Sequence, residues 1–394
     1  MKHPLLFQWD VSTRSGWGVY GLNLLWWWEA LAGTPAYCGL NIDLESLGGA
    51  DPLRLIALGP LIGKSINARA EIRRADDAST LFQGAVLHGM GNQFLGPEAL
   101  GGPVIRGLEN FAVTFFEDTH FPDPQEVRAK YGLFITGSSW NEQVLKAQGV
   151  GNVVKVFQGV DTSLFHPGPS SGALAGRFVI FSGGKLEYRK GQDLVLSAFR
   201  IFSQRHPEAL LVTAWNSPWP ALAATINENP RIAPITFRDD GKVNIPQWVK
   251  DNGVADGQFI DLGHISNYLM PTVLREADVA LFPNRCEGGT NLVAMECLAC
   301  GVPIIASDNT GHKDLVATGA PYALTSQGPV SRGDTGTEGW GESNVDEIVA
   351  CLEKVWTDRG GAQRRGAAGA EVMARWSWKN QIKQLDEAIT PYCR

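Results

Sequence analysis

The sequence predicts an α/β protein with parallel sheets, divided into two domains, and three observations lead to that prediction. Short apolar runs alternate with amphipathic segments along the whole chain, as in folds where helices connect parallel strands. The chain has 394 residues, which suits two domains of roughly 150–200 residues better than one hydrophobic core. The segment 166–176, HPGPSSGALAG, is rich in Pro, Gly and Ser and separates two complete α/β blocks, so it is the expected linker.

The expected strands are short apolar runs, because strands buried on both faces of a parallel sheet carry few polar side chains. These runs are 83–87, 111–116, 132–136, 153–157, 177–182, 209–214, 258–262, 278–283 and 302–306. Three amphipathic segments between them are expected as crossover helices: 192–205, 267–276 and 345–357. In such folds ligands bind at the carboxyl ends of the strands, so the segments that follow the strands are the place to look for a site.

The bulk composition is that of a globular protein and argues against several classes of function. The net charge is −7, and the chain contains no block of five basic residues, which argues against nucleic acid as a partner. The start of the chain, MKHPLLFQWD, is shorter and more polar than a secretory signal, and no apolar run approaches about 18 residues. We therefore expect a cytoplasmic protein. Cys297 and Cys300 form a C-x-x-C inside a helical pattern and are expected to be packed side chains rather than metal or redox groups.

Glycines and tryptophans mark the first strand–helix junction. Gly16 and Gly18 follow the apolar start LLFQW and precede a helical pattern. A G-x-G pattern alone predicts a plain tight turn as readily as a loop that approaches a ligand. Trp26, Trp27 and Trp28 follow one another and cover nearly a full helical turn, so they cannot all face one way. Packing inside the protein is the favoured interpretation, and a membrane or acceptor surface is the alternative.

A second candidate site is the segment 181–199, FSGGKLEYRKGQDLVLSAF. A strand is expected to end at Ser182, and a helix is expected to begin near residues 191–193. Lys185 and Lys190 flank the loop between them, where two ammonium groups can hold a diphosphate and neutralise it as a leaving group. The alternative is a solvated basic turn, since Arg189 lies there too.

The most informative stretch is 283–301, PNRCEGGTNLVAMECLACG. Backbone N–H groups at the start of a helix that follows a Gly turn bind anionic ligands, and small residues let phosphate oxygens come close. Glu287 and Glu296 supply carboxylates that can accept hydrogen bonds from hydroxyl groups. Glu296 stands among apolar residues, so it is expected to be buried and to need polar partners. Phosphate on one side and several hydroxyls on the other describe a nucleotide sugar.

These motifs resemble those of the retaining glycosyltransferases of family 4, whose GT-B fold has two Rossmann-like, doubly wound domains facing each other across a cleft. The similar segments are GGKLEYRKGQDLVLSAF, the run from FIDLG to HKDLV, ITGSSWNEQVLKAQGV with VFQGVDTSLFHP, and ARWSWKNQIKQL. The resemblance covers residues 132–320 best. It implies an acceptor domain over 1–167, completed by a terminal helix at about 374–394, and a donor domain over 168–373.

The resemblance also implies roles for individual residues. Lys185 and Lys190 would bind the donor diphosphate, with Lys185 standing where many members have Arg. Glu287 would accept hydrogen bonds from the donor sugar, and Glu296 would bind the ribose. The further donor-binding residues are Gly16, Gly18, Gly184, His264, Ile265, Gly288, Gly289, Thr290, Asn291 and Leu292, with the base near residues 263–266.

Two departures from the family pattern affect these assignments. Eight residues separate Glu287 from Glu296 instead of the usual seven, so the turn around the sugar is expected to be reshaped. The family often has a His at the end of a first-domain strand, near the reacting sugar. Here the strand reads AVTFFEDTHF, where Glu117 or Asp118 stands near the expected place and His120 follows; His88 ends another expected strand and is the rival on the acceptor side.

The expected reaction is transfer of a sugar, with retention, from a nucleoside diphosphate sugar to an acceptor hydroxyl on a glycan, a lipid or a small molecule. The alternative is a GT-B protein that binds a sugar nucleotide without transfer, or with another specialisation. No metal or other cofactor is expected, because Asp239–Asp240 is the pattern of a surface turn and no D-x-D ends a strand. The chain is expected to be a monomer or a homodimer, with a peripheral contact at the inner membrane face left open.

Overall fold

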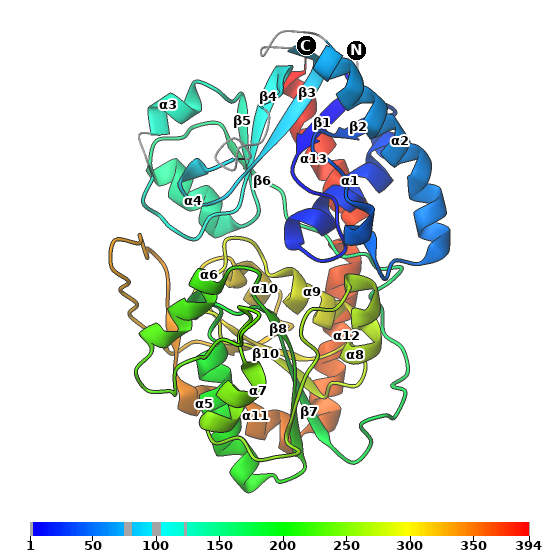
Figure 1. Cartoon of the computed structure of the whole chain (residues 1–394). Helices are drawn as coiled ribbons and strands as arrows, with labels where there is room; N and C mark the ends of the chain where they lie inside the picture. Colours follow the sequence, from blue (N-terminus) through cyan, green and yellow to red (C-terminus); the bar gives the residue numbers. More distant parts are fainter. Residues whose placement is uncertain (1–2, 75–80, 97–103, 122–123, 394) are drawn as a thin grey trace.

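The computed structural model describes residues 3–74, 81–96, 104–121 and 124–393. The chain forms two halves, each built on a parallel six-stranded sheet, with the first half above the second in Figure 1. The α/β class and the two doubly wound units expected from the sequence are confirmed. A small antiparallel pair, β13 (Gln327–Gly328) and β14 (Glu342–Ser343), stands apart from both sheets.

The first sheet has the strand order β2-β1-β3-β4-β5-β6. Its strands are β1 (Leu5–Gln8), β2 (Ala36–Cys38), β3 (Leu81–Met90), β4 (Arg106–Thr114), β5 (Leu133–Thr136) and β6 (Val153–Lys155). The helices of this half are α1 (Gly16–Ala32), η1 (Leu44–Leu47), α2 (Pro52–Arg74), η2 (Asn92–Phe94), α3 (Pro124–Arg128) and α4 (Ser139–Ala147). The order reverses between β1 and β3, which creates a crevice beyond the carboxyl ends of these two strands.

The second sheet has the strand order β12-β11-β10-β7-β8-β9, which reverses between β7 and β10. Its strands are β7 (Phe178–Lys185), β8 (Ala209–Asn216), β9 (Phe259–Asp261), β10 (Val279–Phe282), β11 (Ile304–Ser307) and β12 (Tyr322–Leu324). Its helices include η4 (Tyr188–Lys190), α5 (Gln192–Arg205), α6 (Pro220–Ala224), η5 (Thr225–Glu228), α7 (Ile245–Asp251), η6 (Asn267–Leu269), α8 (Met270–Leu274), α9 (Leu292–Ala299), α10 (His312–Val316) and α11 (Val345–Thr357).

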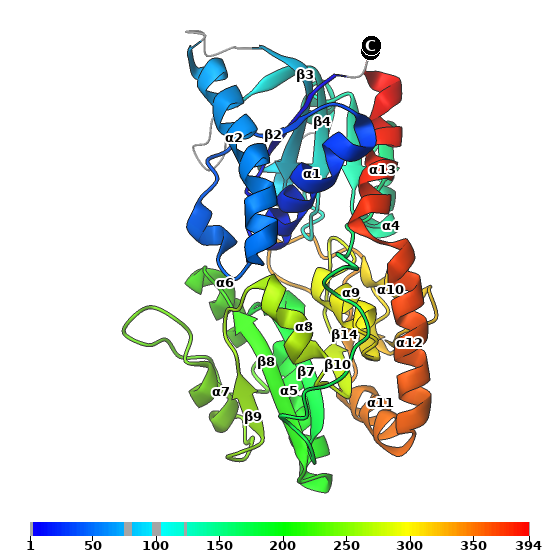
Figure 2. The ribbon, with the colours of Figure 1, turned by 90° about the vertical axis from the view of Figure 1, so that its right-hand side faces the viewer.

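The chain crosses between the halves twice. Residues 156–177, which include the expected linker, join the two sheets without a regular strand or helix. At the end of the chain, α12 (Arg359–Arg375) packs on the second half, while α13 (Trp378–Ile389), before the short η7 (Thr390–Tyr392), returns to the first half beside α1 (Figure 2). The Trp378 ring lies 5.0 Å from the Tyr20 ring of α1. Helix α13 therefore contributes side chains to the hydrophobic core of the first half.

The nine strands expected from apolar runs are all present, and so are the three expected crossover helices. The expected end of β7 is wrong: the strand does not stop at Ser182 but continues to Lys185, because its last three residues pair with residues 214–216 of β8. Within this extension Gly183 is buried, whereas a Cβ on Gly184 would face open space. This extension brings Lys185 to the end of the strand itself.

The tryptophan run and the C-x-x-C are packed as the favoured interpretations required. Trp28 is buried, while Trp26 and Trp27 are partly buried and pack against the first core. Each of these two rings also carries a cation over its face, Arg54 over Trp26 and Lys379 over Trp27. Cys297 and Cys300 are free thiols buried in the core of the second half.

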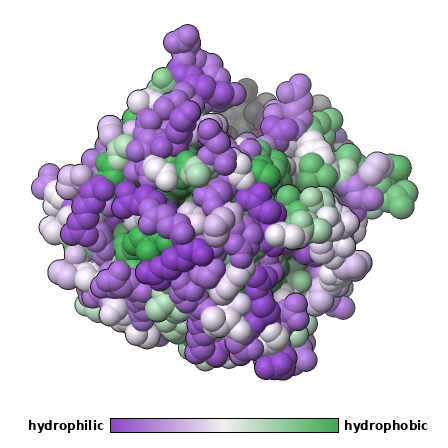
Figure 3. Space-filling view, turned by 90° about the horizontal axis from the view of Figure 1, so that it is seen from below, coloured by the Kyte–Doolittle hydropathy of each residue, from purple (hydrophilic) through white to green (hydrophobic). Residues whose placement is uncertain are grey.

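Seen from the end formed by the second half, hydrophobic residues occur in small groups among hydrophilic ones (Figure 3). Within the described part of the chain, none of the helices combines the length and the apolar character needed to cross a membrane.

Candidate active site

The candidate site lies where the second sheet reverses its order, between the carboxyl ends of β7 and β10. In open α/β sheets this reversal leaves a crevice in which ligands bind, because the connections on its two sides leave in opposite directions. Gly184 in β7 has φ of +125°, a conformation that side-chain-bearing residues rarely adopt. A Cβ built there would face open space, so the backbone at the end of this strand is accessible.

A cluster of charges joins the two strand ends. The Glu287 carboxylate, which follows β10, accepts hydrogen bonds from the Lys190 ammonium group and from the Asn284 amide on the same oxygen, Oε1. Its other oxygen, Oε2, lies 3.3 Å from Nη1 of Arg189. Arg189 also donates through Nε to Glu187, at 2.5 Å. Lys190 and Glu287, which the sequence assigned to one ligand from separate motifs, are thus direct partners.

The loops that carry the cluster are tied together by their backbones. The Arg285 and Cys286 N–H groups both donate to the Arg189 carbonyl oxygen, at 2.7 and 3.2 Å. Gly191, which precedes α5, has φ of +70°, and a Cβ there would lie 2.3 Å from the Pro283 carbonyl oxygen. Only glycine therefore fits between these two loops.

Electrostatics makes Glu287 a strong acid in this setting. Burial alone would raise the pKa of its carboxyl group, but the Lys190 ammonium and the Arg189 guanidinium lower that pKa to about 2. Although burial lowers the pKa of Arg189, the carboxylates of Glu117, Glu187 and Glu287 outweigh it and hold the pKa well above its usual range. The cluster is charged at neutral pH and compensates its own burial.

Glu117 reaches this cluster from the first half. It follows β4 by three residues, and its carboxylate lies 3.2 Å from Nη2 of Arg189. Burial raises the pKa of Glu117, and the neighbouring Arg189 opposes that rise. Of the first-half candidates, Glu117 is the one that the structure brings to the charged cluster.

Glu296 lies in the middle of α9 and has a very different environment. Its side chain is buried among apolar neighbours, and the Asn267 amide of η6 donates to its Oε1 at 2.5 Å. Burial raises the pKa of this carboxyl group to about 8, against the weaker opposing effect of the Asn267 hydrogen bond. Glu296 is therefore mainly protonated at neutral pH in this structure.

The loop between these glutamates is pressed against the first half. A Cβ on Gly288 would lie 2.6 Å from the Phe116 carbonyl oxygen, so the two backbones meet closely there. The Ser138 hydroxyl donates to the Gly288 carbonyl oxygen at 2.7 Å. Gly289 approaches the Phe115 ring, at 3.2 Å from its assumed Cβ. The loop thus fixes the donor half against the carboxyl end of β4.

Asn291 caps the start of α9. Its φ is +65°, and its side-chain oxygen accepts from the Ala294 N–H. The Asn291 amide is held in turn by Nε2 of the buried His312, at 3.1 Å. Thr290 bonds the Met295 sulfur and is fully buried, while Leu292 lies partly exposed at the first helical position.

The G-x-G of the first half forms the first turn of α1 instead of a turn before it. Gly16 is exposed at the helix start, where its assumed Cβ would lie 3.5 Å from the Leu292 side chain. Gly18 is buried against Ser12, with only 2.0 Å from its assumed Cβ to that hydroxyl. Gly16 therefore faces the donor loop, and Gly18 serves close packing.

The segment expected to meet the base touches the first half as well. His264 is exposed, and its Nε2 lies 3.3 Å from the Arg14 carbonyl oxygen. Ile265 packs against the hydrophobic core of the second half. The Ser266 hydroxyl donates to the Thr13 hydroxyl at 3.2 Å.

The two histidine candidates, His88 and His120, have surroundings that differ from those of the charged cluster. His88 does not end its strand, because β3 continues to Met90, and the ring is buried with Nε2 at 2.9 Å from Oδ1 of Asn110. Burial lowers the pKa of His88 to about 4, so it is a neutral histidine of the core. His120 is exposed, and its Nδ1 lies 2.6 Å from the Asp334 carbonyl oxygen.

The Gly-rich loop, residues 328–342, crosses to the first half just beyond β4. The Gly336 N–H donates to the Asp118 carboxylate at 2.8 Å, and the Trp340 indole N–H donates to the Glu117 carbonyl oxygen at 2.9 Å. Asp118 thus anchors this loop and does not reach the charged cluster through any contact seen here. The loop is held over the segment that carries the first-half candidates.

Several residues of the site were not singled out from the sequence. Arg189 was named only in the alternative interpretation of this loop as a solvated basic turn, and the structure buries it between three carboxylates. Asn284 and Asn267 carry no motif signal. Arg285 is fully buried and makes a bidentate pair with Asp193. Arg285 follows a predicted strand end, and a charged residue at such a position was the one sequence signal that could have identified it as part of the site.

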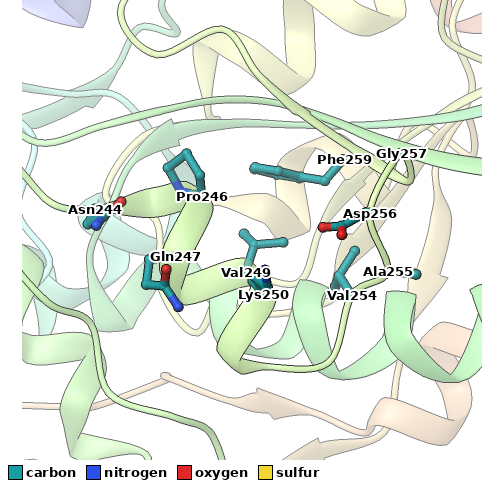
Figure 4. Close-up of a pocket in the computed structure, with 10 residues that line it drawn as sticks. All are labelled: Asn244, Pro246, Gln247, Val249, Lys250, Val254, Ala255, Asp256, Gly257 and Phe259. Atoms are coloured by element: carbon teal, nitrogen blue, oxygen red, sulfur yellow. The ribbon is translucent and has the colours of Figure 1, made fainter.

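Outside the charged cluster, the described residues form a cavity but no group of side chains suited to hold a metal ion. The cavity, of about 330 Å³, lies between α7 and β9 and shares no residue with the charged cluster. Figure 4 shows the residues that line it, among them Gln247, Lys250 and Phe259. Among the residues that the structure describes, no group of three or more His, Cys, Asp and Glu side chains is arranged to hold a metal ion.

Comparison with known proteins gives a family for the second half and a fold for the whole chain. Residues 169–330 match the model of a family described as Glycosyl transferases group 1. A curated relative, the GDP-mannose-dependent alpha-(1-6)-phosphatidylinositol monomannoside mannosyltransferase of Mycolicibacterium smegmatis, is 26% identical over 246 residues, which cover 59% of this chain and 54% of that protein. The chain spans about half the length of the curated relatives it matches.

Two solved structures extend the likeness to both halves. A sucrose-phosphate synthase from Thermosynechococcus elongatus superposes with a TM-score of 0.65 at 15% identity, covering 99% of each chain. HepE from Anabaena, in complex with UDP and glucose, gives a TM-score of 0.65 at 14% identity, covering 99% of this chain and 100% of that one. At these identities the likeness establishes the fold.

Proposed function

Because the chain belongs to the glycosyl transferases group 1 family and has the GT-B fold, we propose that it is a retaining glycosyltransferase. It moves a sugar from a nucleoside diphosphate sugar to an acceptor hydroxyl group. The observation that carries the proposal is the cluster of Lys190, Arg189 and Glu287 at the point where the second sheet reverses its order. Cations at this crevice suit the diphosphate of a nucleotide, and the adjoining helix α9 carries the second acidic group, Glu296.

Glu287 retains capacity for a sugar hydroxyl in spite of its existing partners. A carboxylate offers about four lone-pair sites. Lys190 and Asn284 occupy two on Oε1, and Arg189 occupies one on Oε2. The remaining site on Oε2 can accept one hydrogen bond from the donor sugar. We assign this role to Glu287.

Lys190 and Lys185 stabilise the diphosphate as it leaves. Negative charge develops on the leaving oxygen while the sugar acquires oxocarbenium character, and cations fixed beforehand stabilise that charge without reorganising. Lys190 is nearly buried between the strand ends, with a side chain 13% exposed, whereas the Lys185 side chain is 41% exposed. Lys190 therefore contributes the stronger, less screened interaction. The leaving group itself takes the proton of the acceptor hydroxyl.

Arg189 and Glu117 link this chemistry to the first half. Arg189 contacts carboxylates from both halves, which aligns the acceptor side with the donor side when the halves meet. Acceptor binding is assigned to residues 1–167 with the terminal helix at about 374–394, and donor binding to residues 168–373. Because Glu117 contacts Arg189, we assign it the place on the first half that faces the reacting sugar.

GDP-mannose is the donor to test first, since curated relatives are named as GDP-mannose-dependent mannosyltransferases. The purified chain is incubated with GDP-mannose, UDP-glucose and ADP-glucose, without added metal and with EDTA, and release of the nucleoside diphosphate is measured with and without glycan and lipid acceptors. The proposal expects one donor to be consumed faster in the presence of an acceptor. Nucleotide binding without turnover on any acceptor in the panel would instead favour a sugar-nucleotide-binding protein.

A further inference from the structure

Trp219 is an exposed tryptophan just beyond the carboxyl end of β8, and its ring lies against the Lys185 ammonium group. The nitrogen of Lys185 is 4.9 Å from the ring centroid, within the range of a cation–π interaction. The Trp219 residue is 53% exposed. A large apolar side chain left half in solvent beside a proposed diphosphate site is not explained by burial in the core.

The backbones on both sides of this contact are fixed. β7 and β8 pair in parallel, which sets Lys185 directly opposite Asn216. The Leu186 N–H donates to the Asn216 carbonyl oxygen at 3.0 Å. The Ser217 hydroxyl donates to the Trp219 carbonyl oxygen at 3.0 Å and lies 3.3 Å from its N–H. The backbone positions from which the Trp219 ring and the Lys185 side chain extend are therefore fixed by hydrogen bonds.

The Lys185 side chain has little else to orient it. Its nitrogen lies 3.8 Å from Oε2 of Glu187, beyond hydrogen-bond distance, and the side chain is 41% exposed. A lysine carries its charge on a flexible four-carbon stem, whereas an arginine presents a planar fork that orients itself on phosphate. An unrestrained lysine loses rotamer freedom when it binds a ligand, which weakens the binding.

We propose that Trp219 is a positioning residue that holds the Lys185 ammonium group toward the donor diphosphate, an inference that rests on the proposed function. The ring attracts the cation through its face and accepts no conventional hydrogen bond. All three N–H groups therefore remain available to phosphate oxygens. The aromatic face supplies the orientation that the geometry of a guanidinium group would provide by itself.

A double-mutant cycle on nucleotide affinity tests this role. Calorimetric titrations with GDP and with UDP are made on the wild type, Trp219→Ala, Lys185→Met and the double variant. We expect Trp219→Ala to weaken binding of the preferred nucleotide by about 2- to 30-fold. In the Lys185→Met background, Trp219→Ala should cause no further loss. An equal loss in both backgrounds would show a merely structural role and would overturn the inference.

Two comparisons complete the experiment. Leu222 is 37% exposed on the short helix α6 that follows Trp219, and Leu222→Ala should leave the affinity unchanged. Trp219→Phe keeps an aromatic face and should lose less affinity than Trp219→Ala. If the wild type binds but Trp219→Ala binds equally well, this inference alone fails. A wild type that binds no nucleoside diphosphate overturns both it and the proposed function.

Discussion

Glu287 and Glu296 are both buried glutamates on one short segment, yet their surroundings drive their acidities in opposite directions. Glu287 faces Lys190 and Arg189, which lower its pKa to about 2 against the effect of burial. Burial raises the pKa of Glu296 to about 8, and the hydrogen bond from the Asn267 amide opposes this rise without outweighing it. Eight residues separate the two positions. The difference shows that fixed charges, rather than depth of burial, decide which carboxyl group ionises here.

This contrast assigns the two ends of the proposed donor site different tasks. At the Glu287 end, balanced charges suit a diphosphate and the sugar attached to it. At the Glu296 end, a carboxyl group with few partners suits neutral hydroxyl groups such as those of ribose.

The largest effect is expected from neutralising Glu287. Glu287→Gln leaves Lys190 and Arg189 without their shared buried anion, so we expect a loss of about 3–5 kcal/mol in the free energy of unfolding at pH 7. Glu296→Gln replaces a protonated acid with a neutral group of the same shape and should cost less than about 1 kcal/mol. Urea denaturation of the two variants measures both changes. Equal losses in both variants would contradict the contrast.

Removing Lys190 should disable transfer more than it disturbs folding. Lys190→Ala withdraws the less exposed of the two lysines assigned to the leaving diphosphate, and we expect the rate of transfer to fall by about 10²- to 10³-fold. The exposed Lys146, which pairs with Glu142 on α4, provides the matched control Lys146→Ala. Initial rates with the preferred donor measure the effect. Wild-type turnover of Lys190→Ala would refute the assignment of the diphosphate site.

The two glutamates should give opposite pH dependences of stability. The pKa of Glu296 is raised in the folded protein, so its contribution is present below about pH 4.5 and is lost as the pH rises toward 8. The pKa of Glu287 is lowered, so its contribution is present above about pH 4.5 and is lost as the pH falls toward 2. Each slope approaches about 1.4 kcal/mol per pH unit.

The free energy of unfolding is measured against pH for the wild type, Glu296→Gln and Glu287→Gln. The difference between the wild type and Glu296→Gln should decline between about pH 4.5 and 8, and the difference between the wild type and Glu287→Gln should rise between about pH 2 and 4.5. Slopes of the same sign for both residues would rule out the electrostatic contrast.

The smallest effect is a proton released on binding. Ribose hydroxyls that donate to Glu296 favour its carboxylate form, so binding at pH 7 should release up to about one proton. Calorimetry in two buffers that differ in their enthalpy of ionisation counts this proton. If the Glu296→Gln variant still releases this proton on binding, the proton comes from a group other than Glu296.

The sequence predicted the architecture and half of the candidate site. Apolar runs identified the strands because parallel sheets bury both of their faces, and the motifs identified Lys190, Glu287 and Glu296 separately. The burial of Arg189 was not predicted, because nothing in the local sequence reveals that the carboxylates of Glu117 and Glu187 flank it in space. That arrangement depends on how the two halves meet.

Other parts of the site follow from pairings that no local pattern encodes. Lys185 reaches the strand end because β7 continues through its glycines, and Trp219 lies beside it because of the register with β8. His88 was expected at a strand end, but β3 is longer than its apolar run and places the ring in the core. Strand length and register decide these positions, and both depend on tertiary partners.

We propose that the crevice between β7 and β10 binds a nucleoside diphosphate through Lys190 at one end and Glu296 at the other. Calorimetric titration of the wild type and Lys190→Ala with GDP and UDP tests it most directly. We predict saturable binding of one nucleotide by the wild type and an affinity at least about 10-fold weaker in Lys190→Ala, with the folded structure retained. Equal affinities for the wild type and the variant, or no binding of either nucleotide by the wild type, would contradict the claim.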